Sequence, residues 1–228
     1  MRFIKTLLGV LLLPVLIATG KEFFRDISGI GLLSNTLHVL ERGALVYLFF
    51  HVMIIRPVYI YVLGHEFVHA LATWVCGGRV ESFNVTPGGG NVVTSKTNFF
   101  IELSPYFVPI YTIFLGFIYF ILRLMDKEIP FMSTIFVFCV GVTMAFHFVM
   151  TSEILRIEQP DVLKSGFLFS LVIIFLANML IIVAVFCPIF DNLSFVSFIK
   201  GSAAGSAELY REIYGRIVEF FDKLTVAV

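Results

Sequence analysis

His65, Glu66 and His69 are the residues of this chain whose types and spacing could do chemistry. They form a His-Glu-x-x-His pattern in the segment YVLGHEFVHALATW. Residues four apart lie on the same face of a helix, so both imidazoles can bind one metal ion. Zinc suits imidazole ligands, and a catalytic zinc keeps one position for a water whose pKa it lowers to about 7. Glu66, beside that position, can accept the proton of the water, which predicts a metal-dependent hydrolytic site.

The apolar sequence around these residues strengthens the metal-site interpretation. An ionisable side chain within a membrane-spanning helix costs about 2.5–3.5 kcal/mol on insertion scales. Burying all three side chains within one and a half helical turns therefore costs considerable free energy, unless a metal ion offsets it. The alternative is a structural role, in which both histidines hydrogen-bond to neighbouring helices and Glu66 is protonated.

A catalytic zinc needs a third protein ligand, and Asp161 is the favoured candidate. It follows Pro160, which stiffens the chain, and it precedes an apolar run that begins at Gly166. The carboxylate can therefore point back into a helix bundle from the entry of this run. The alternative ligands are Glu153, Glu102 and His147. Both Glu153 and His147 are also candidates to orient a ligating imidazole through a hydrogen bond.

The glycine-rich sequence after this helix is the candidate region for binding a substrate. Residues 79–97, RVESFNVTPGGGNVVTSKT, predict two short strands around a glycine turn. An exposed strand edge can bind an extended peptide by backbone pairing, although a purely structural hairpin is the alternative. Asn178 lies within a long apolar run, where an amide either joins helices or contacts a substrate. The candidate substrate-binding residues are Asn84, Val85, Gly89, Gly90 and Asn178.

The composition of the chain places these residues in a membrane protein. Of 228 residues, 59% are hydrophobic and 14% are charged, and the mean hydropathy is +0.97. The apolar residues gather into segments near the ~20 residues that a helix needs to cross a lipid bilayer. The sequence therefore predicts an all-α, polytopic bundle of about five to six transmembrane helices, with a hairpin-like loop after the His-Glu-x-x-His helix.

The charges and the cysteines exclude two other kinds of site. The 16 basic and 16 acidic residues give no net charge and no basic cluster, so a nucleic-acid partner is not expected. The cysteines are too far apart for a Cys-x-x-Cys site and are expected to be packing residues. They are Cys76, Cys139 and Cys187.

Local sequence patterns separate the apolar segments. Residues 1–19 favour an uncleaved membrane anchor over a signal peptide, because no convincing small-residue cleavage site follows the apolar run. Residues 20–43 predict a polar connection into a helix that starts at Ser34-Asn35. Arg56-Pro57 predicts a break in the next apolar stretch, and Gly77-Gly78 predicts the end of the His-Glu-x-x-His helix.

The rest of the chain completes one membrane domain. Further apolar segments are expected at residues 98–124, 131–150 and 166–190. We expect a membrane-embedded domain over residues 1–200, with its core at 57–190. Residues 201–228 alternate apolar and charged residues at helical spacing, which predicts an amphipathic helix on the membrane surface or against a partner.

These motifs together resemble the site-2 protease family of intramembrane zinc metalloproteases, in its compact bacterial branch without a PDZ domain. The resemblance rests on GHEFVHA (64–70), GGRVESFNVTPGGGNV, NFFIELSPYFVP and Gln159-Pro160-Asp161, and covers roughly residues 57–180. It implies zinc bound by His65, His69 and Asp161, with Glu66 as the base. It also implies cleavage of membrane-anchored protein substrates and a place in the inner membrane of a bacterium. The family commonly shows Asn-Pro-Asp-Gly or Leu-Asp-Gly, whereas valine follows the aspartate here.

Two functional hypotheses follow from the sequence. The first is a zinc endopeptidase that acts within or near the membrane on an anchored substrate. The second is a non-catalytic membrane protein, either an inactive relative that binds transmembrane helices or a metal carrier. If the basic N-terminus is cytoplasmic and residues 36–76 form one bent return span, the loop after the motif and Asp161 lie on the same side. A hairpin at Arg56-Pro57 would reverse that assignment.

Overall fold

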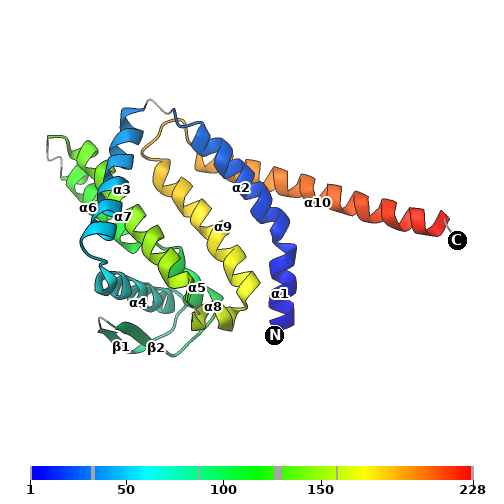
Figure 1. Cartoon of the computed structure of the whole chain (residues 1–228), viewed down its shortest axis with the longest axis horizontal. Helices are drawn as coiled ribbons and strands as arrows, with labels where there is room; N and C mark the ends of the chain where they lie inside the picture. The colour runs from blue at the N-terminus through cyan, green and yellow to red at the C-terminus, as the bar shows by residue number, and fades with distance from the viewer. Residues whose placement is uncertain (1, 32–33, 87, 126–129, 158, 227–228) are drawn as a thin grey trace.

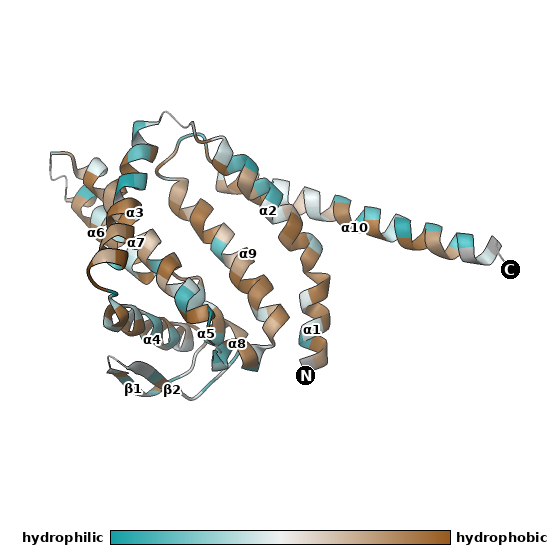
Figure 2. Cartoon of the chain, viewed as in Figure 1, coloured by the Kyte–Doolittle hydropathy of each residue, from teal (hydrophilic) through white to brown (hydrophobic). Residues whose placement is uncertain are grey.

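The computed structural model describes residues 2–31, 34–86, 88–125, 130–157 and 159–226, and most of them are helical (Figure 1). Apolar residues cover the helices that pack side by side, whereas the C-terminal helix carries many polar residues (Figure 2). The elements in chain order are α1 (Arg2–Leu11), α2 (Leu13–Ser28), α3 (Asn35–Met53), α4 (Val58–Val75), β1 (Val80–Thr86), β2 (Gly89–Thr94), α5 (Phe99–Leu103), η1 (Ser104–Tyr106), α6 (Ile110–Leu124), α7 (Met132–Leu155), α8 (Pro160–Ser165), α9 (Phe167–Phe186) and α10 (Phe195–Val226).

Several helices are long and apolar enough to cross a membrane. Within the described ranges there are three such stretches, Phe3–Ser28, α7 and α9. Two further pairs pass the same test but are bent, α3 with α4 by 119° and Phe99–Tyr106 with α6 by 76°. If each bent pair is one span the count rises to five, at the lower end of the five to six predicted from the sequence.

The expected polar connection over residues 20–43 is wrong in its first part, because α2 continues to Ser28. Glu22 is buried there and pairs with Arg25 one helical turn later. The Glu22 carboxylate occupies the space beside Gly201 of α10, where a Cβ atom could not fit. The predicted start of α3 is confirmed, since the Ser34 hydroxyl accepts a hydrogen bond from the Leu37 amide at 3.4 Å.

The predicted break at Arg56-Pro57 is confirmed and sets the direction of α4. Helix α3 ends at Met53, and α4 begins at Val58 after a bend of 119°. The His51 ring bridges the Tyr47 hydroxyl (2.9 Å) and Glu153 of α7 (3.1 Å), which fixes the end of α3. As a result α4 lies across one end of the bundle with the hairpin and α8, and the N-terminus lies toward the same end (Figure 1).

Glycines allow α3 and α7 to pack at close range. A Cβ atom on Gly43 would lie 2.1 Å from the Phe138 carbonyl oxygen, and one on Gly141 would lie 2.1 Å from the Leu40 carbonyl oxygen. Backbone atoms cannot move aside as a side chain can, so any larger residue must separate the two helices. The α3–α7 pair carries the bend that leads into α4.

Gly43→Ala is therefore expected to lower the free energy of unfolding by about 1–3 kcal/mol through overpacking. Thermal unfolding of the purified protein in detergent measures the change. Gly116→Ala on α6 is the matched control, because a Cβ atom there would meet nothing within 4 Å. Equal melting temperatures for the two variants would contradict the packing described for α3 and α7.

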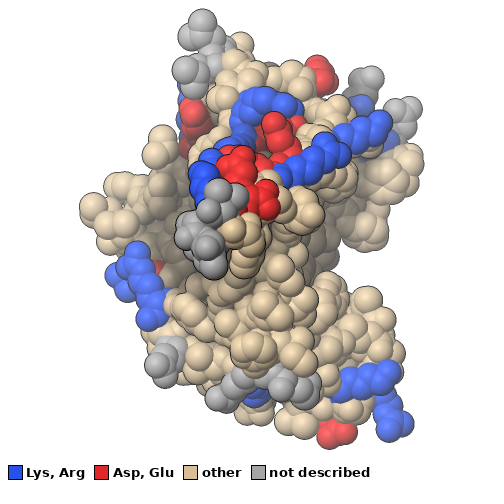
Figure 3. All heavy atoms as spheres, turned by 90° about the vertical axis from the view of Figure 1, so that its right-hand side faces the viewer, with Lys and Arg blue, Asp and Glu red and all other residues tan. Residues whose placement is uncertain are grey.

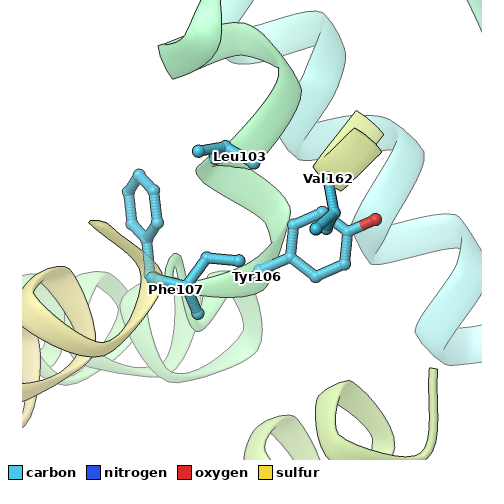
Figure 4. Packing of buried hydrophobic residues seen from close by; sticks show 5 residues of the cluster. Leu103, Tyr106, Phe107 and Val162 are labelled. Carbon is cyan, nitrogen blue, oxygen red and sulfur yellow. The ribbon is translucent and has the colours of Figure 1, made fainter. Parts of the chain in front are cut away.

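The predicted apolar segment 98–124 is divided in the structure into α5, η1 and α6. Pro105 and Pro109 lie in the break, and proline removes a backbone donor and constrains the residue before it. The bent segment places Tyr106 and Leu103 in a buried cluster with Phe107 and with Val162 of α8 (Figure 4). This cluster packs α8 against the bent segment that contains Leu103 and Tyr106. The residues of α8 therefore lie close to α4.

Helix α10 begins at Phe195, so the expected boundary at residue 201 falls inside a helix. Its first half packs on α2. A Cβ atom on Gly205 would lie 3.4 Å from the Cβ atom of Ala18. The second half projects from the bundle (Figure 1). Figure 3 looks toward its C-terminal end and shows basic and acidic side chains gathered there. Its contact with a membrane or a partner remains a prediction.

Candidate metal site

Helix α4 presents the two motif histidines and ends where the sequence predicts. The chain leaves α4 after Val75, and Gly77 takes a positive φ of 69° that favours glycine. The His65 and His69 rings lie next to each other, with centroids 4.9 Å apart. The i, i+4 spacing therefore brings both imidazoles to one face, as the motif predicts.

Asp161 meets the two histidines although it lies more than ninety residues away in the sequence. One ligand atom of each residue, His65, His69 and Asp161, lies within 4.8 Å of the others. The His69 Nε2 atom is 3.4 Å from Asp161 Oδ2. Two ligands at 2.0–2.1 Å from a tetrahedral zinc ion lie about 3.3 Å apart, so this pair fits that spacing.

Helix α8 holds the Asp161 carboxylate in this position. Pro160 occupies the first turn of α8, where its missing amide hydrogen costs nothing, and Val162 is anchored in the buried cluster of Figure 4. The Tyr106 hydroxyl lies 3.5 Å from Asp161 Oδ2 and donates toward it. Burial opposes ionisation of Asp161, but the hydrogen bond and charge of His69 outweigh it and hold the pKa of this carboxyl below its usual value.

A backbone carbonyl fixes the orientation of the His69 ring. His69 Nδ1 donates to the Ile101 carbonyl oxygen at 2.7 Å, so Nε2 is the atom that faces Asp161 and that would bind a metal ion once it has lost its proton. The Asn98 side chain accepts from the Ile101 amide at 2.9 Å and caps α5, so the carbonyl is itself held in place. This is the arrangement that a ligating histidine requires.

The donor set fits zinc. Two imidazoles and one carboxylate are a donor set that a catalytic zinc ion uses, and here the three residues line a cavity. The Nδ1 atom of His65 is buried and has no hydrogen-bond partner among the described residues, so this ring lacks the support that His69 receives. The chemistry of the three donors therefore suits a zinc ion, and the distance between His69 and Asp161 matches such a site.

The other candidate third ligands have different partners. Both oxygens of Glu102 are engaged, one with the Thr97 hydroxyl at 2.9 Å and one with the Ser165 hydroxyl. Glu153 bonds to His51 and lies 3.8 Å from Arg56, away from the three clustered residues. His147 is buried beside His65 but is not part of the cluster. Asp161 is therefore the candidate that the fold brings to both histidines.

A cavity of about 360 Å³ opens at the three clustered residues. Glu66 is 8% exposed and lines this cavity, next to strand β2. A Cβ atom on Gly90 would lie 2.4 Å from the Glu66 Cγ atom, so the strand and the carboxylate are in direct contact. The predicted hairpin is confirmed, with Val85 paired to Gly90 in an antiparallel register.

The candidate substrate-binding residues separate into two groups. Gly90 lines the cavity together with its strand neighbour Asn91, whereas Asn84, Val85 and Gly89 lie elsewhere on the hairpin. The Asn178 amide donates to the backbone carbonyls of Tyr106 (3.0 Å) and Ile174 (2.9 Å). Asn178 thus joins α9 to the bent segment instead of lining the cavity.

The sequence did not point to several residues that support the site. Tyr106 is completely buried, packs edge-on against His65 at 5.1 Å between ring centroids and reaches Asp161. The Ile101 carbonyl belongs to the backbone, so the identity of the residue gives no sign of its role. Pro105 and Pro109 are the signal in the sequence, because prolines this close together predict a break in the helix around Tyr106.

Comparison with known protein families, with curated proteins and with solved structures gives no match to this chain.

Proposed function

We propose that this chain is a zinc-dependent endopeptidase that hydrolyses a peptide bond in a membrane-anchored protein substrate. The observation that carries the proposal is the approach of His65, His69 and Asp161 within 4.8 Å, beside a buried glutamate that faces a cavity. Burying ionisable side chains in an apolar region costs free energy. Several of them kept together there are therefore a candidate functional site. The resemblance to site-2 proteases extends the proposal to a multi-pass protein of a bacterial inner membrane.

Each residue of the site has a distinct role in this proposal. His65, His69 and Asp161 would hold the zinc ion, which when bound would polarise a water molecule and lower its pKa to about 7. Glu66 would accept the proton of that water and pass it to the leaving amine. The Ile101 carbonyl and the Tyr106 hydroxyl orient His69 and Asp161, respectively. No covalent bond between enzyme and substrate is needed.

Strand β2 is placed to align the substrate. Gly90, Asn91, Val92 and Thr94 of this strand line the cavity that Glu66 faces. An extended peptide can pair with a strand edge through backbone hydrogen bonds. A helical substrate must unwind locally first, because its peptide bonds are shielded by their own hydrogen bonds. The position of α4 across one end of the bundle favours cleavage near the membrane boundary of the substrate (Figure 1).

Metal analysis of the purified protein tests the proposal. We expect about one zinc ion per chain, and its loss in His65→Ala, His69→Ala and Asp161→Ala. His38→Ala is the matched control, because the His38 side chain is 44% exposed and pairs with Glu41 on α3. A chain without zinc, or three ligand variants that keep it, would overturn the proposal. Zinc without cleavage of any anchored substrate would favour the metal carrier or the inactive relative.

A further inference from the structure

His147 of α7 is a buried histidine that the proposed reaction does not use. It is 6% exposed, and its Nε2 atom has no hydrogen-bond partner among the residues described. The Nδ1 atom of His65 is buried and equally unpartnered within the same ranges. A buried ring nitrogen without a partner is destabilising, so two of them on residues that line one cavity require an explanation.

The two rings border the same small cavity. It has a volume of about 10 Å³ and is lined by His65 and His147 together with aromatic and aliphatic side chains, among them Tyr61, Phe146 and Val68. That volume is room for about one water molecule, and a buried water requires about two to four polar partners. His65 Nδ1 and His147 Nε2, which are both unpartnered among the described residues and belong to lining residues of this cavity, are the two polar partners that such a water would have.

His65 separates this small cavity from the cavity of the proposed metal site. It is the residue common to the linings of both, on the metal side with Glu66 and Asp161 and on the other side with His147. A hydrogen bond from His65 Nδ1 to a group in the small cavity would therefore determine which tautomer His65 presents to the metal side. The Ile101 carbonyl does the same for His69.

We infer that His147 is a positioning residue that orients His65 through one buried water molecule, an inference that rests on the proposed metal site. His65 Nδ1 donates its proton to the water oxygen, and the water donates to the lone pair of His147 Nε2. His65 then keeps the lone pair of Nε2 for the metal ion. Both zinc-binding histidines are thereby held in the same tautomer, one by a carbonyl and one by a water.

Zinc affinity is the quantity that tests this role. The His147→Leu variant removes the acceptor and is expected to bind zinc about 10- to 100-fold more weakly, as other substitutions of groups that support metal ligands do. The His147→Gln variant keeps a polar atom that reaches the water and is expected to restore most of the affinity. Competition with a chromophoric chelator measures the affinities, and the visible spectrum of the cobalt-substituted protein reports the ligand geometry.

His51→Leu is the matched control, because His51 is also buried but bonds to Tyr47 and Glu153 away from the site. It is expected to lower stability and leave zinc affinity unchanged. If His147→Leu does not fold, the shorter His147→Asn replaces it with the same expected loss relative to His147→Gln. Wild-type affinity and spectrum in the Leu or Asn variant overturn the inference alone, whereas a wild-type chain that binds no zinc overturns the proposed function.

Discussion

Glu66→Gln is expected to slow peptide cleavage by about 10²- to 10⁴-fold while the chain keeps its zinc, because an amide cannot accept the proton that a carboxylate takes from water. The substitution keeps the size of the side chain, so its contact with Gly90 is retained. Glu66 is not one of the three clustered ligand residues, so its replacement leaves the ligand set complete.

Cleavage of an anchored substrate reconstituted with the purified protein in lipid vesicles provides the rate, and metal analysis of the same preparation provides the zinc content. Glu102→Gln is the control, because Glu102 lines the same cavity but is bonded to Thr97 and Ser165. A Glu66→Gln chain that cleaves as fast as the parent would rule out Glu66 as the base. A chain that loses both zinc and activity would show that Glu66 supports the metal instead.

The parts of the fold that the sequence predicted are those encoded by local signals. Proline at position 57, the glycine pair at 77 and 78 and the cap at Ser34 act on their own neighbours in the chain, so their effects appear in the structure where expected. The hairpin belongs to the same class, because its glycines and alternating residues determine its turn. The spacing of His65 and His69 also needs only one helix to place both rings together.

The parts that the sequence did not predict depend on contacts between distant segments. Glu22 is buried on α2, where Gly201, far along the chain, leaves room for its carboxylate. The break before α6 and the inward turn of Tyr106 depend on the packing of that segment against α8. Such contacts have no periodicity to detect in one sequence, so only a general preference for Asp161 could be stated before its neighbours were known.

The contact between β2 and α4 gives the hairpin a second role beside peptide binding. Gly90 is the point at which the strand touches Glu66, and glycine is the residue that leaves space for the carboxylate. The strand edge that would align a peptide and the base that would act on it are therefore fixed relative to each other by a single residue. This coupling predicts that a change in the hairpin alters the chemical step and not only substrate binding.

Gly90→Ala is accordingly expected to lower the rate constant of cleavage by about 10²-fold, with zinc content and stability nearly unchanged. Its Cβ atom would lie 2.4 Å from Glu66 Cγ and 2.7 Å from Oε1, so the flexible carboxylate must move aside. A displacement of about 1 Å at a catalytic group is enough for a loss of this size.

Gly88→Ala is the control, because the nearest atom to its Cβ is 4.0 Å away on Thr86. An increase in KM alone would mean that the strand binds substrate without positioning Glu66. Equal rates for the two variants would mean that the hairpin does not affect catalysis.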